Sequence, residues 1–187
     1  RTHKPGVGGS NPPLATNIIM KLSVIIISFQ SNHLLKKILI SIPKKYQIII
    51  VENSMLKSTK KLEKKYKNLN VITPNENLGY AKAFNLALKK CKNKFVLTLT
   101  PDVLIEKNLI VKIEKVIDKL KNFTLLAPEY KNQKIYKNYT SFGNNKFKKN
   151  KIINFRLEEV KEIDWCFCIL NKNKFSNSRV LDENFFM

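Results

Sequence analysis

The chain has 187 residues, which is enough for one domain with a hydrophobic core and too few for two. Its formal net charge of +21 suggests a polyanionic partner, but the lysines are spread over nearly the whole sequence. Only three residues are arginine, the side chain best suited to base and phosphate contacts. The composition therefore disfavours sequence-specific nucleic-acid binding, and no apolar run approaches the roughly 20 residues that a membrane-spanning helix needs.

Residues 1–19 differ in composition from everything that follows them. They hold three of the five glycines and three of the seven prolines, and they lack the apolar core of a signal peptide. We therefore expect a disordered, non-native extension here and a glycine-poor folded domain over residues 20–187, starting at Met20. At the other end LDENFFM breaks off on an apolar run, so we expect this domain to be incomplete at its C-terminus.

Short runs of β-branched and apolar residues predict strands that are buried on both faces. The clearest runs are LSVIIIS, QIIIVE and KFVLTLT, at residues 22–28, 47–52 and 94–100. Further strands are predicted at residues 69–73, 124–128 and 163–171. Between the strands, apolar residues at helical spacing predict helices over residues 31–41, 57–67, 78–91 and 109–120. This alternation is typical of a doubly wound α/β sheet, whereas residues 131–158 indicate an irregular surface excursion.

Polar side chains follow each of the three clearest strands. The strands end in the triplets SFQ, ENS and TPD, at residues 28–30, 52–54 and 100–102. Because the carboxyl ends of parallel strands meet at one edge of a sheet, we expect these groups to form a binding site. For Asp102 taken alone, a turn or a helix cap is the simpler interpretation, since Pro-Asp is common in turns.

The stretch NENLGYAKAFNLAL, residues 75–88, predicts a helix whose start can bind a phosphate. Asn77 is a suitable N-cap, and Gly79 lets the backbone come close to a ligand. The first turn offers free N–H groups at the positive end of the helix dipole. Asn85 shares the apolar face of this helix with Leu88, so its amide must bond either inside the protein or to a ligand.

The three cysteines, Cys91, Cys166 and Cys168, form no framework for disulfides. An odd number of cysteines without the spacing of a disulfide framework indicates reduced thiols in a cytosolic protein. In a strand over residues 163–171, Cys166 and Cys168 would share one face. We expect packing there, because no further Cys or His lies at the spacing of metal ligands.

Five segments together resemble the family-2 glycosyltransferases of the GT-A fold, and most closely the rhamnosyltransferase-like branch that builds bacterial cell-surface polysaccharides. In chain order they are SVIIISFQSNHLLKKILISI, IIIVENS, NLGYAKAFNLAL, LTLTPDV and LDENFFM, over roughly residues 21–187. The resemblance implies inverting transfer of a sugar from a nucleoside diphosphate sugar to an acceptor hydroxyl. It also implies a divalent metal, Mg²⁺ or Mn²⁺, at the diphosphate.

The resemblance assigns the nucleotide side of the site to six residues. Ser28 and Phe29 match the end of the first strand, which lines the nucleoside pocket. Glu52 stands where the family more often has an aspartate that hydrogen-bonds the base or the ribose. The N-x-G…N pattern that flanks the nucleotide in the family corresponds here to Asn77, Gly79 and Asn85.

The same resemblance places the metal at Asp102. This residue matches the last acid of the family's D-x-D motif, whose carboxylate meets the metal. The first acid of that motif is Thr100 in this chain, so only one carboxylate is present.

The acceptor side begins at Asp164 and Trp165, which match the strand that enters it in the family. Cys166 and Phe167 follow, where the family usually has a small Gly-Ala pair. The segment DENFFM at residues 182–187 matches a family segment that runs on into an acidic pair, and one acid of that pair is the general base. We therefore expect the catalytic base beyond Met187, with lesser candidates within the chain at Asp164, Asp182 and Glu183.

The sequence thus predicts a truncated GT-A glycosyltransferase domain whose partners are a nucleoside diphosphate sugar and a glycan or lipid-linked acceptor. We expect a cytoplasmic protein that can also contact the inner face of the cell membrane through its lysines. The alternative is a non-catalytic basic module that binds nucleic acid or an anionic membrane surface. Binding through lysines should weaken steeply with ionic strength, whereas nucleotide binding should depend more on metal and base.

Overall fold

The computed structural model describes most of the chain from Leu22 to Asn184. The described residues are 22–106, 108–120, 122–128, 139–141, 148–150, 155–157, 159–175 and 179–184. The extension predicted over residues 1–19 lies outside them. No helix in these ranges is long and apolar enough to cross a membrane.

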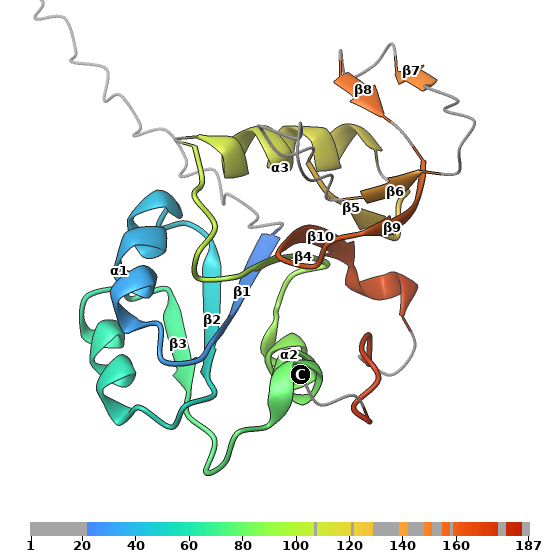
Figure 1. The fold of residues 1–187 in the computed structure, drawn as a ribbon. Helices are drawn as coiled ribbons and strands as arrows, with labels where there is room; N and C mark the ends of the chain where they lie inside the picture. Colours follow the sequence, from blue (N-terminus) through green and yellow to red (C-terminus); the bar gives the residue numbers. More distant parts are fainter. Residues whose placement is uncertain are drawn as a thin grey trace, which may run out of the picture.

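A six-stranded sheet forms the centre of the fold (Figure 1). Its strand order is β3-β2-β1-β4-β10-β5, and β1 pairs in parallel with both β2 and β4. β10 runs antiparallel between β4 and β5. The strands are β1 (Leu22–Ser28), β2 (Gln47–Glu52), β3 (Leu69–Ile72), β4 (Phe95–Leu99), β5 (Leu125–Leu126) and β10 (Phe167–Asn171). The doubly wound, mostly parallel sheet predicted from the sequence is confirmed.

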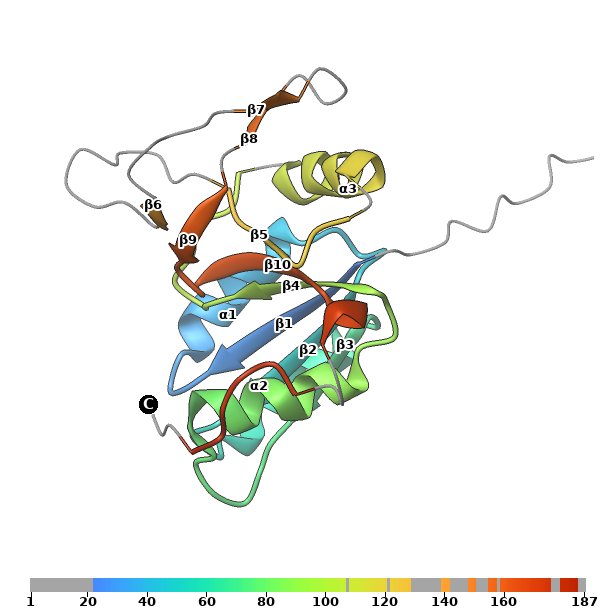
Figure 2. The same ribbon diagram turned by 90° about the vertical axis from the view of Figure 1, so that its right-hand side faces the viewer.

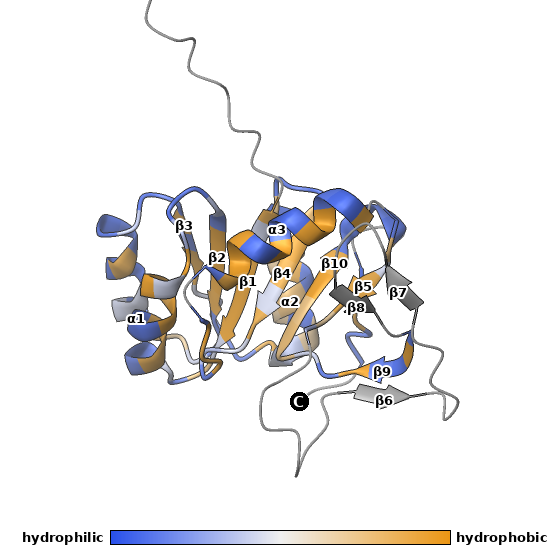
Figure 3. Ribbon diagram, turned by 90° about the horizontal axis from the view of Figure 1, so that it is seen from above, coloured by the Kyte–Doolittle hydropathy of each residue, from blue (hydrophilic) through white to orange (hydrophobic). Residues whose placement is uncertain are grey.

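Helices cover both faces of this sheet (Figures 1 and 2). They are α1 (Asn32–Ser41), α2 (Gly79–Lys90) and α3 (Leu109–Leu120), close to the predicted ranges. Alternate residues of a strand point to opposite faces, and β1 shows the result. Val24 and Ile26 pack in the cluster that holds α1 and α3, whereas Ile25 and Ile27 pack with α2. Figure 3 shows that the strands are mainly hydrophobic, while hydrophilic residues lie along the helices and loops.

Residues 57–67 do not form the predicted α-helix. The structure has a 3-10 helix there, η1 (Lys57–Lys64), in which only Thr59 is buried. Lysines four apart, such as Lys57 and Lys61, lie on one side of an α-helix and repel each other. With little apolar surface to bury, the segment gains little from the α-helical form.

The chain after residue 131 also differs from the prediction. The expected irregular excursion contains three short strands, β6 (Tyr139–Ser141), β7 (Lys148–Asn150) and β8 (Phe155–Leu157). The strand predicted over residues 163–171 is split into β9 (Val160–Ile163), which pairs with β6, and β10, which joins the central sheet. A turn over residues 164–166 separates them, because the two strands belong to different sheets.

The loop before β2 is fastened to α3 by a group of three side chains. Tyr46 Oη donates to Glu114 Oε2 over 2.8 Å, and Lys45 Nζ lies 2.5 Å from the same oxygen. Burial and the bond to Glu114 raise the pKa of Tyr46 to about 12. This contact ties the amino end of the sheet to the helix layer.

Candidate functional site

The polar ends of β1 and β2 meet at the carboxyl edge of the sheet, as predicted. The strand register sets Ser28 opposite Glu52, and both are fully buried. Ser28 Oγ donates to Glu52 Oε2 over 2.8 Å, and the Asn53 N–H donates to the Ser28 carbonyl over 2.7 Å. The strand order reverses between β1 and β4, so this cluster lies beside the switch point where open α/β sheets bind ligands.

The Glu52 carboxylate is surrounded by neutral hydrogen-bond donors. Oε1 accepts the Ser54 N–H over 3.2 Å and also the Ser54 hydroxyl, while Thr59 Oγ1 lies 3.3 Å from Oε2. A buried carboxylate is costly unless such bonds replace its water. Glu52 therefore lies at the predicted edge, but its carboxylate is enclosed by protein donors and forms the floor of the site. The sequence indicated Ser54, in the triplet ENS, but not Thr59, for which a hydroxyl shortly after a buried acid was the available signal.

The loop after β1 carries the exposed part of this edge. Phe29 is 51% exposed, although it directly follows a buried strand. Gln30 has a positive φ of 51°, a strained value for a residue other than glycine. Its N–H donates to Ser54 Oγ over 3.1 Å, so the loops after β1 and β2 are joined. The edge thus combines an exposed aromatic ring with an enclosed polar cluster.

The start of α2 is held by two asparagines. Asn53, 4% exposed, accepts the Leu78 N–H over 3.1 Å and donates to the Gly79 carbonyl over 3.1 Å. Asn77 Oδ1 accepts the Gly79 N–H over 3.0 Å. The helix begins at Gly79, whose φ of 69° a Cβ would disfavour. Asn77 therefore stands one residue before the N-cap position, Leu78, and not at it.

The phosphate site expected at this helix start stays a prediction, but two of its N–H groups are already bonded. The N–H groups of Leu78 and Gly79 are occupied by asparagine oxygens and are not free. The sequence analysis missed the role of Asn53, although an amide directly after a buried strand was a signal for it. The loop after β2 and the first turn of α2 consequently form one connected piece of structure.

Asn85 is 1% exposed and bonds to the chain near its C-terminal end. Its Nδ2 donates to the Leu181 carbonyl over 2.8 Å and to Glu183 Oε1 over 3.0 Å. Its Oδ1 accepts the N–H groups of Val180 and Leu181 over 3.1 and 3.3 Å. The amide has no capacity left for a nucleotide, because it has two donor hydrogens and two acceptor positions. The assignment of Asn85 to nucleotide binding stays a prediction, while in this structure its amide bonds to the protein.

Asp102 lies in a turn just beyond β4. The Val103 N–H donates to the Thr100 carbonyl over 3.2 Å, which closes the turn. Thr100 is itself tied to the next strand, since its N–H donates to the Cys166 carbonyl over 3.0 Å. The Asp102 side chain is exposed, and within the described ranges no hydrogen bond or ion pair occupies its carboxylate.

The residues near Asp102 fit a metal only together with a ligand. In the part of the chain that the structure describes, no three His, Cys, Asp or Glu side chains are grouped as a metal site. Mg²⁺ is often held by one or two carboxylates with phosphate oxygens completing its shell. One exposed carboxylate at a strand end fits that mode and does not form a metal site by itself.

The turn at residues 164–166 places an aromatic cluster on the predicted acceptor side. The Trp165 ring contacts Phe84 edge-to-face, with centroids 5.4 Å apart, and Tyr80 stacks on Phe84 at 6.3 Å. Tyr80 Oη lies 3.2 Å from Thr98 Oγ1, and burial raises the pKa of Tyr80. Asp164 is partly exposed beside this cluster.

The cysteines are packed, as expected, but not in the expected way. Cys166 lies in the turn, so it does not share a strand face with Cys168. Cys168 is buried in β10 and Cys91 at the end of α2, and burial raises the pKa of each thiol to about 12. Thiols held neutral in this way are poor nucleophiles and poor metal ligands.

The two acids near the C-terminal end take part in local contacts. Asp182 Oδ1 accepts the Asn184 N–H over 3.0 Å. Glu183 Oε2 lies 3.3 Å from Arg179 Nη2, in addition to its bond with Asn85. Met187 lies outside the described residues.

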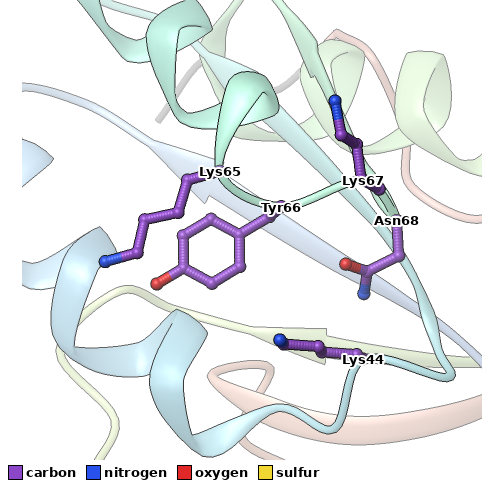
Figure 4. A pocket seen from close by; sticks show the side chains of 5 residues that line it. All are labelled: Lys44, Lys65, Tyr66, Lys67 and Asn68. Atoms are coloured by element: carbon purple, nitrogen blue, oxygen red, sulfur yellow. The ribbon is translucent and has the colours of Figure 1, made fainter.

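A basic hollow, which the sequence did not predict, lies at the opposite edge of the sheet (Figure 4). It is about 280 Å³ and is formed by the loops that precede β2 and β3. The Lys65 ammonium lies 5.6 Å from the centre of the Tyr66 ring. Its lining contains three lysines and no acid: Lys44, Lys65, Tyr66, Lys67 and Asn68.

Many solved structures resemble this fold, including the following two. Residues 1–349 of TarS from S. aureus, in complex with UDP-GlcNAc, are 28% identical with a TM-score of 0.51, over 58% of this chain and 34% of that one. Mannosyltransferase PcManGT from Pyrobaculum calidifontis, in complex with GDP-Man and Mn²⁺, has a TM-score of 0.58 at 12% identity, over 82% of this chain and 45% of that one. The chain thus matches less than half of the length of either neighbour. Its mostly parallel sheet with helices on both faces is the GT-A fold that they share.

The sequence comparisons point in the same direction. A search of curated proteins gives no significant match. The sequence profile described as Glycosyl transferase family 2 matches residues 23–178, which include β1 through β4 and β10. The family that the resemblance indicated is therefore confirmed, and this chain belongs to glycosyl transferase family 2.

Proposed function

We propose that this chain binds a nucleoside diphosphate sugar at the carboxyl edge of its sheet and transfers the sugar, with inversion, to an acceptor hydroxyl. One observation carries the proposal. The neighbouring strands β1 and β4, between which the strand order reverses, are followed by an exposed aromatic ring, Phe29, and an exposed carboxylate, Asp102. An aromatic face suits a nucleobase, and a carboxylate suits a metal-bound diphosphate.

The enclosed cluster below Phe29 would shape the nucleoside pocket. Ser28 and Glu52 form a rigid floor, and Ser54 joins the loops on either side of it. Such a floor positions a base without rearrangement on binding. The pocket walls would be the loop after β1 and the Asn53-bound start of α2.

Asp102 would hold the divalent ion together with the phosphate oxygens of the donor. When bound, the ion would offset the negative charge that develops on the diphosphate leaving group. The structure of PcManGT, which holds GDP-Man and Mn²⁺, supports a divalent ion in this fold. Thr100 takes the place of the missing first acid of the motif at the same strand end.

The acceptor hydroxyl must lose a proton during transfer. Asp182 and Glu183 are engaged in contacts near their own segment, and Asp164 flanks the aromatic cluster. We keep the expectation, drawn from the family resemblance, that the base follows Met187. The proposed acceptor is a glycan or a lipid-linked sugar, in keeping with the rhamnosyltransferase-like branch and its cell-surface polysaccharides.

Titration calorimetry with UDP tests the donor site, because TarS, at 28% identity, was solved with UDP-GlcNAc. We expect saturable binding that is tighter with Mn²⁺ than with EDTA. Asp102→Ala should remove the metal-dependent part, whereas Glu159→Ala, at an exposed acid, is the matched control. Phe29→Ala should weaken binding about 10-fold, from lost base stacking. Its control is Ile40→Ala, at an exposed apolar residue of α1.

Two results would contradict this assignment. One is a folded chain that binds neither UDP nor GDP, and the other is an Asp102→Ala variant whose metal dependence is unchanged. Sugar transfer by this chain should be slow, since a general base contributes about 10²–10⁴-fold in rate. Efficient transfer would place the base at Asp164, Asp182 or Glu183.

The basic hollow favours a second role, peripheral contact with an anionic membrane at the cytoplasmic face. Three ammonium groups with no acid among them attract phosphate-bearing lipid head groups. Co-sedimentation with phosphatidylserine vesicles should fall sharply as salt rises from about 0.05 to 0.5 M. Replacing Lys44, Lys65 and Lys67 by Ala should reduce it while UDP binding is kept. Equal binding by this variant, or stronger retention on RNA, would contradict the membrane role.

A further inference from the structure

Asn85 uses all of its hydrogen-bonding capacity on one short segment of the chain. The segment Arg179–Asn184 lies more than 90 residues away in sequence, yet four bonds of 2.8–3.3 Å join it to this amide. Figure 2 shows this C-terminal stretch, in dark red, crossing beside α2. The contacts involve both the backbone of the segment and the Glu183 carboxylate.

The position of Asn85 along α2 connects the two halves of the site. It lies six residues after Gly79, or about 9 Å along the axis at 1.5 Å per residue. At the start of the helix, Asn53 binds Leu78 and Gly79 and so joins α2 to the donor-side loop. The same helix therefore bonds to the donor side at its first turn and to the C-terminal segment through Asn85.

The bonds to Asn85 have few substitutes within the segment. Among the described residues, the segment contains one further side-chain bond, Asp182 to Asn184, and one exposed ion pair, Arg179 to Glu183. An exposed pair of this kind contributes little to stability. Val180 and Leu181 also pack against the α2 side of the core. The direction of the chain at Glu183 therefore depends on the Asn85 amide.

We propose that Asn85 is a positioning residue that fastens Arg179–Asn184 to α2 and orients the Glu183 carboxylate. It sets the direction in which the chain leaves the donor half toward the acceptor side, and it does not touch the nucleotide. The claim that Asn85 directs the chain toward the acceptor side rests on the proposed function. The claim that Asn85 holds residues 179–184 against α2 rests on the four hydrogen bonds alone. The two parts fail in different experiments.

Hydrogen exchange tests the fastening directly. In Asn85→Ala, the exchange rate of the amides at residues 180–184 should rise about 10-fold or more. The segment can then open locally without the cost of breaking the bonds to Asn85. The exchange rates of amides in β1 and β4 should stay within about twofold of those in the unchanged chain. Asn70→Ala, at an exposed asparagine of β3, is the matched control and should change neither region. Unchanged exchange at residues 180–184 in Asn85→Ala would overturn the proposal.

A swap of donor and acceptor tests the contact with Glu183. Asn85→Asp sets two carboxylates against each other and should raise exchange at residues 182–184. Adding Glu183→Gln returns a donor to face Asp at position 85, and exchange should fall back at least partly toward that of the unchanged chain. A structural defect at residue 85 alone would not be rescued in this way. If Asn85→Ala does not fold, the comparison of the single and double swap decides, and no recovery overturns the proposal.

UDP affinity separates the proposal from the alternative that Asn85 binds the nucleotide. A positioning residue predicts a Kd within about twofold of the unchanged chain for Asn85→Ala. A rise of about 10-fold in Kd without faster exchange at residues 180–184 would instead make Asn85 a nucleotide ligand. If the unchanged chain binds no UDP, the proposed function fails, and the exchange experiments still decide the role of Asn85.

Discussion

The carboxyl and amino edges of the central sheet are held together in different ways. At the carboxyl edge, buried asparagines and one buried carboxylate join loops that are far apart in sequence. Three of the four residues described with positive φ also lie at this edge: Gln30 and Met55 in loops, and Gly79 at the start of α2. Strained backbone and buried polar networks cost free energy and are typical of functional sites.

The amino edge also has a buried asparagine, because Asn171 pairs with the first residue of β4 and donates to the Phe123 carbonyl over 3.1 Å. Ser23 donates to Gln47 over 2.7 Å, Asn93 donates to Ser23 over 3.0 Å, and lysines line the hollow around Tyr66. These contacts also join residues that are far apart in sequence, but they are only partly buried, as is the bond between Tyr46 and Glu114. The difference is that the carboxyl edge encloses its carboxylate, Glu52, whereas the amino edge exposes the lysines of the basic hollow.

The largest expected effect is at the buried acid of the carboxyl edge. Glu52→Ala removes the acceptor of Ser28 and Ser54 and should lower the free energy of unfolding by about 2–4 kcal/mol. Urea denaturation measures this loss, with Glu159→Ala as a control that should stay within about 0.5 kcal/mol. A loss below about 1 kcal/mol would mean that the hydroxyls find other partners.

A smaller effect is expected at the asparagine that holds the start of α2. Asn53→Ala leaves the Leu78 N–H without its partner, removes one bond to the Gly79 carbonyl and should cost about 2 kcal/mol. Thermal or urea unfolding measures the cost, and hydrogen exchange should show faster exchange at Leu78 first. An equal loss in Asn70→Ala, where the side chain is exposed on β3, would show that the effect is not specific to the helix start.

At the amino edge, Tyr46→Phe removes one bond to Glu114 and should cost about 1 kcal/mol near neutral pH. The raised pKa of Tyr46, about 12 against 10, gives a sign for the pH dependence. Between these values the folded state keeps a proton that the unfolded state has lost, so the free energy of unfolding falls as pH rises.

Unfolding curves at pH 9, 10, 11 and 12 would measure this alkaline loss, and Tyr46→Phe should reduce its slope above about pH 10. An unchanged slope in the variant would assign the alkaline loss to other groups. The buried thiols of Cys91 and Cys168 are the first to test, because their pKa values are also raised to about 12. UDP affinity should be unchanged in Tyr46→Phe, since this contact is at the other edge.

The smallest effect is expected for the lysines of the basic hollow. The triple replacement of Lys44, Lys65 and Lys67 by Ala should change the free energy of unfolding by less than about 0.5 kcal/mol, because these side chains are mostly exposed. Urea denaturation measures the change in stability, and UDP titration measures whether the donor site at the other edge is affected. A large loss of stability would show that the hollow is part of the core packing.

The sequence alone determined the layered architecture of this protein. Continuous runs such as LSVIIIS bury both strand faces, and their alternation with amphipathic segments leaves few topologies other than a doubly wound sheet. The same strand ends indicated Ser28, Glu52 and Asp102, because a buried parallel strand delivers its last residues to one edge. The five ordered segments indicated the family, which the sequence profile confirmed.

Only the tertiary structure decided how the polar side chains are used. Whether Glu52 is open or enclosed depends on Ser54 and Thr59, which reach it across a loop. Whether Asn85 serves a ligand or the protein depends on a segment about 95 residues away. Helical and strand periods report local burial, whereas hydrogen-bond partners are chosen by long-range packing that no local pattern encodes.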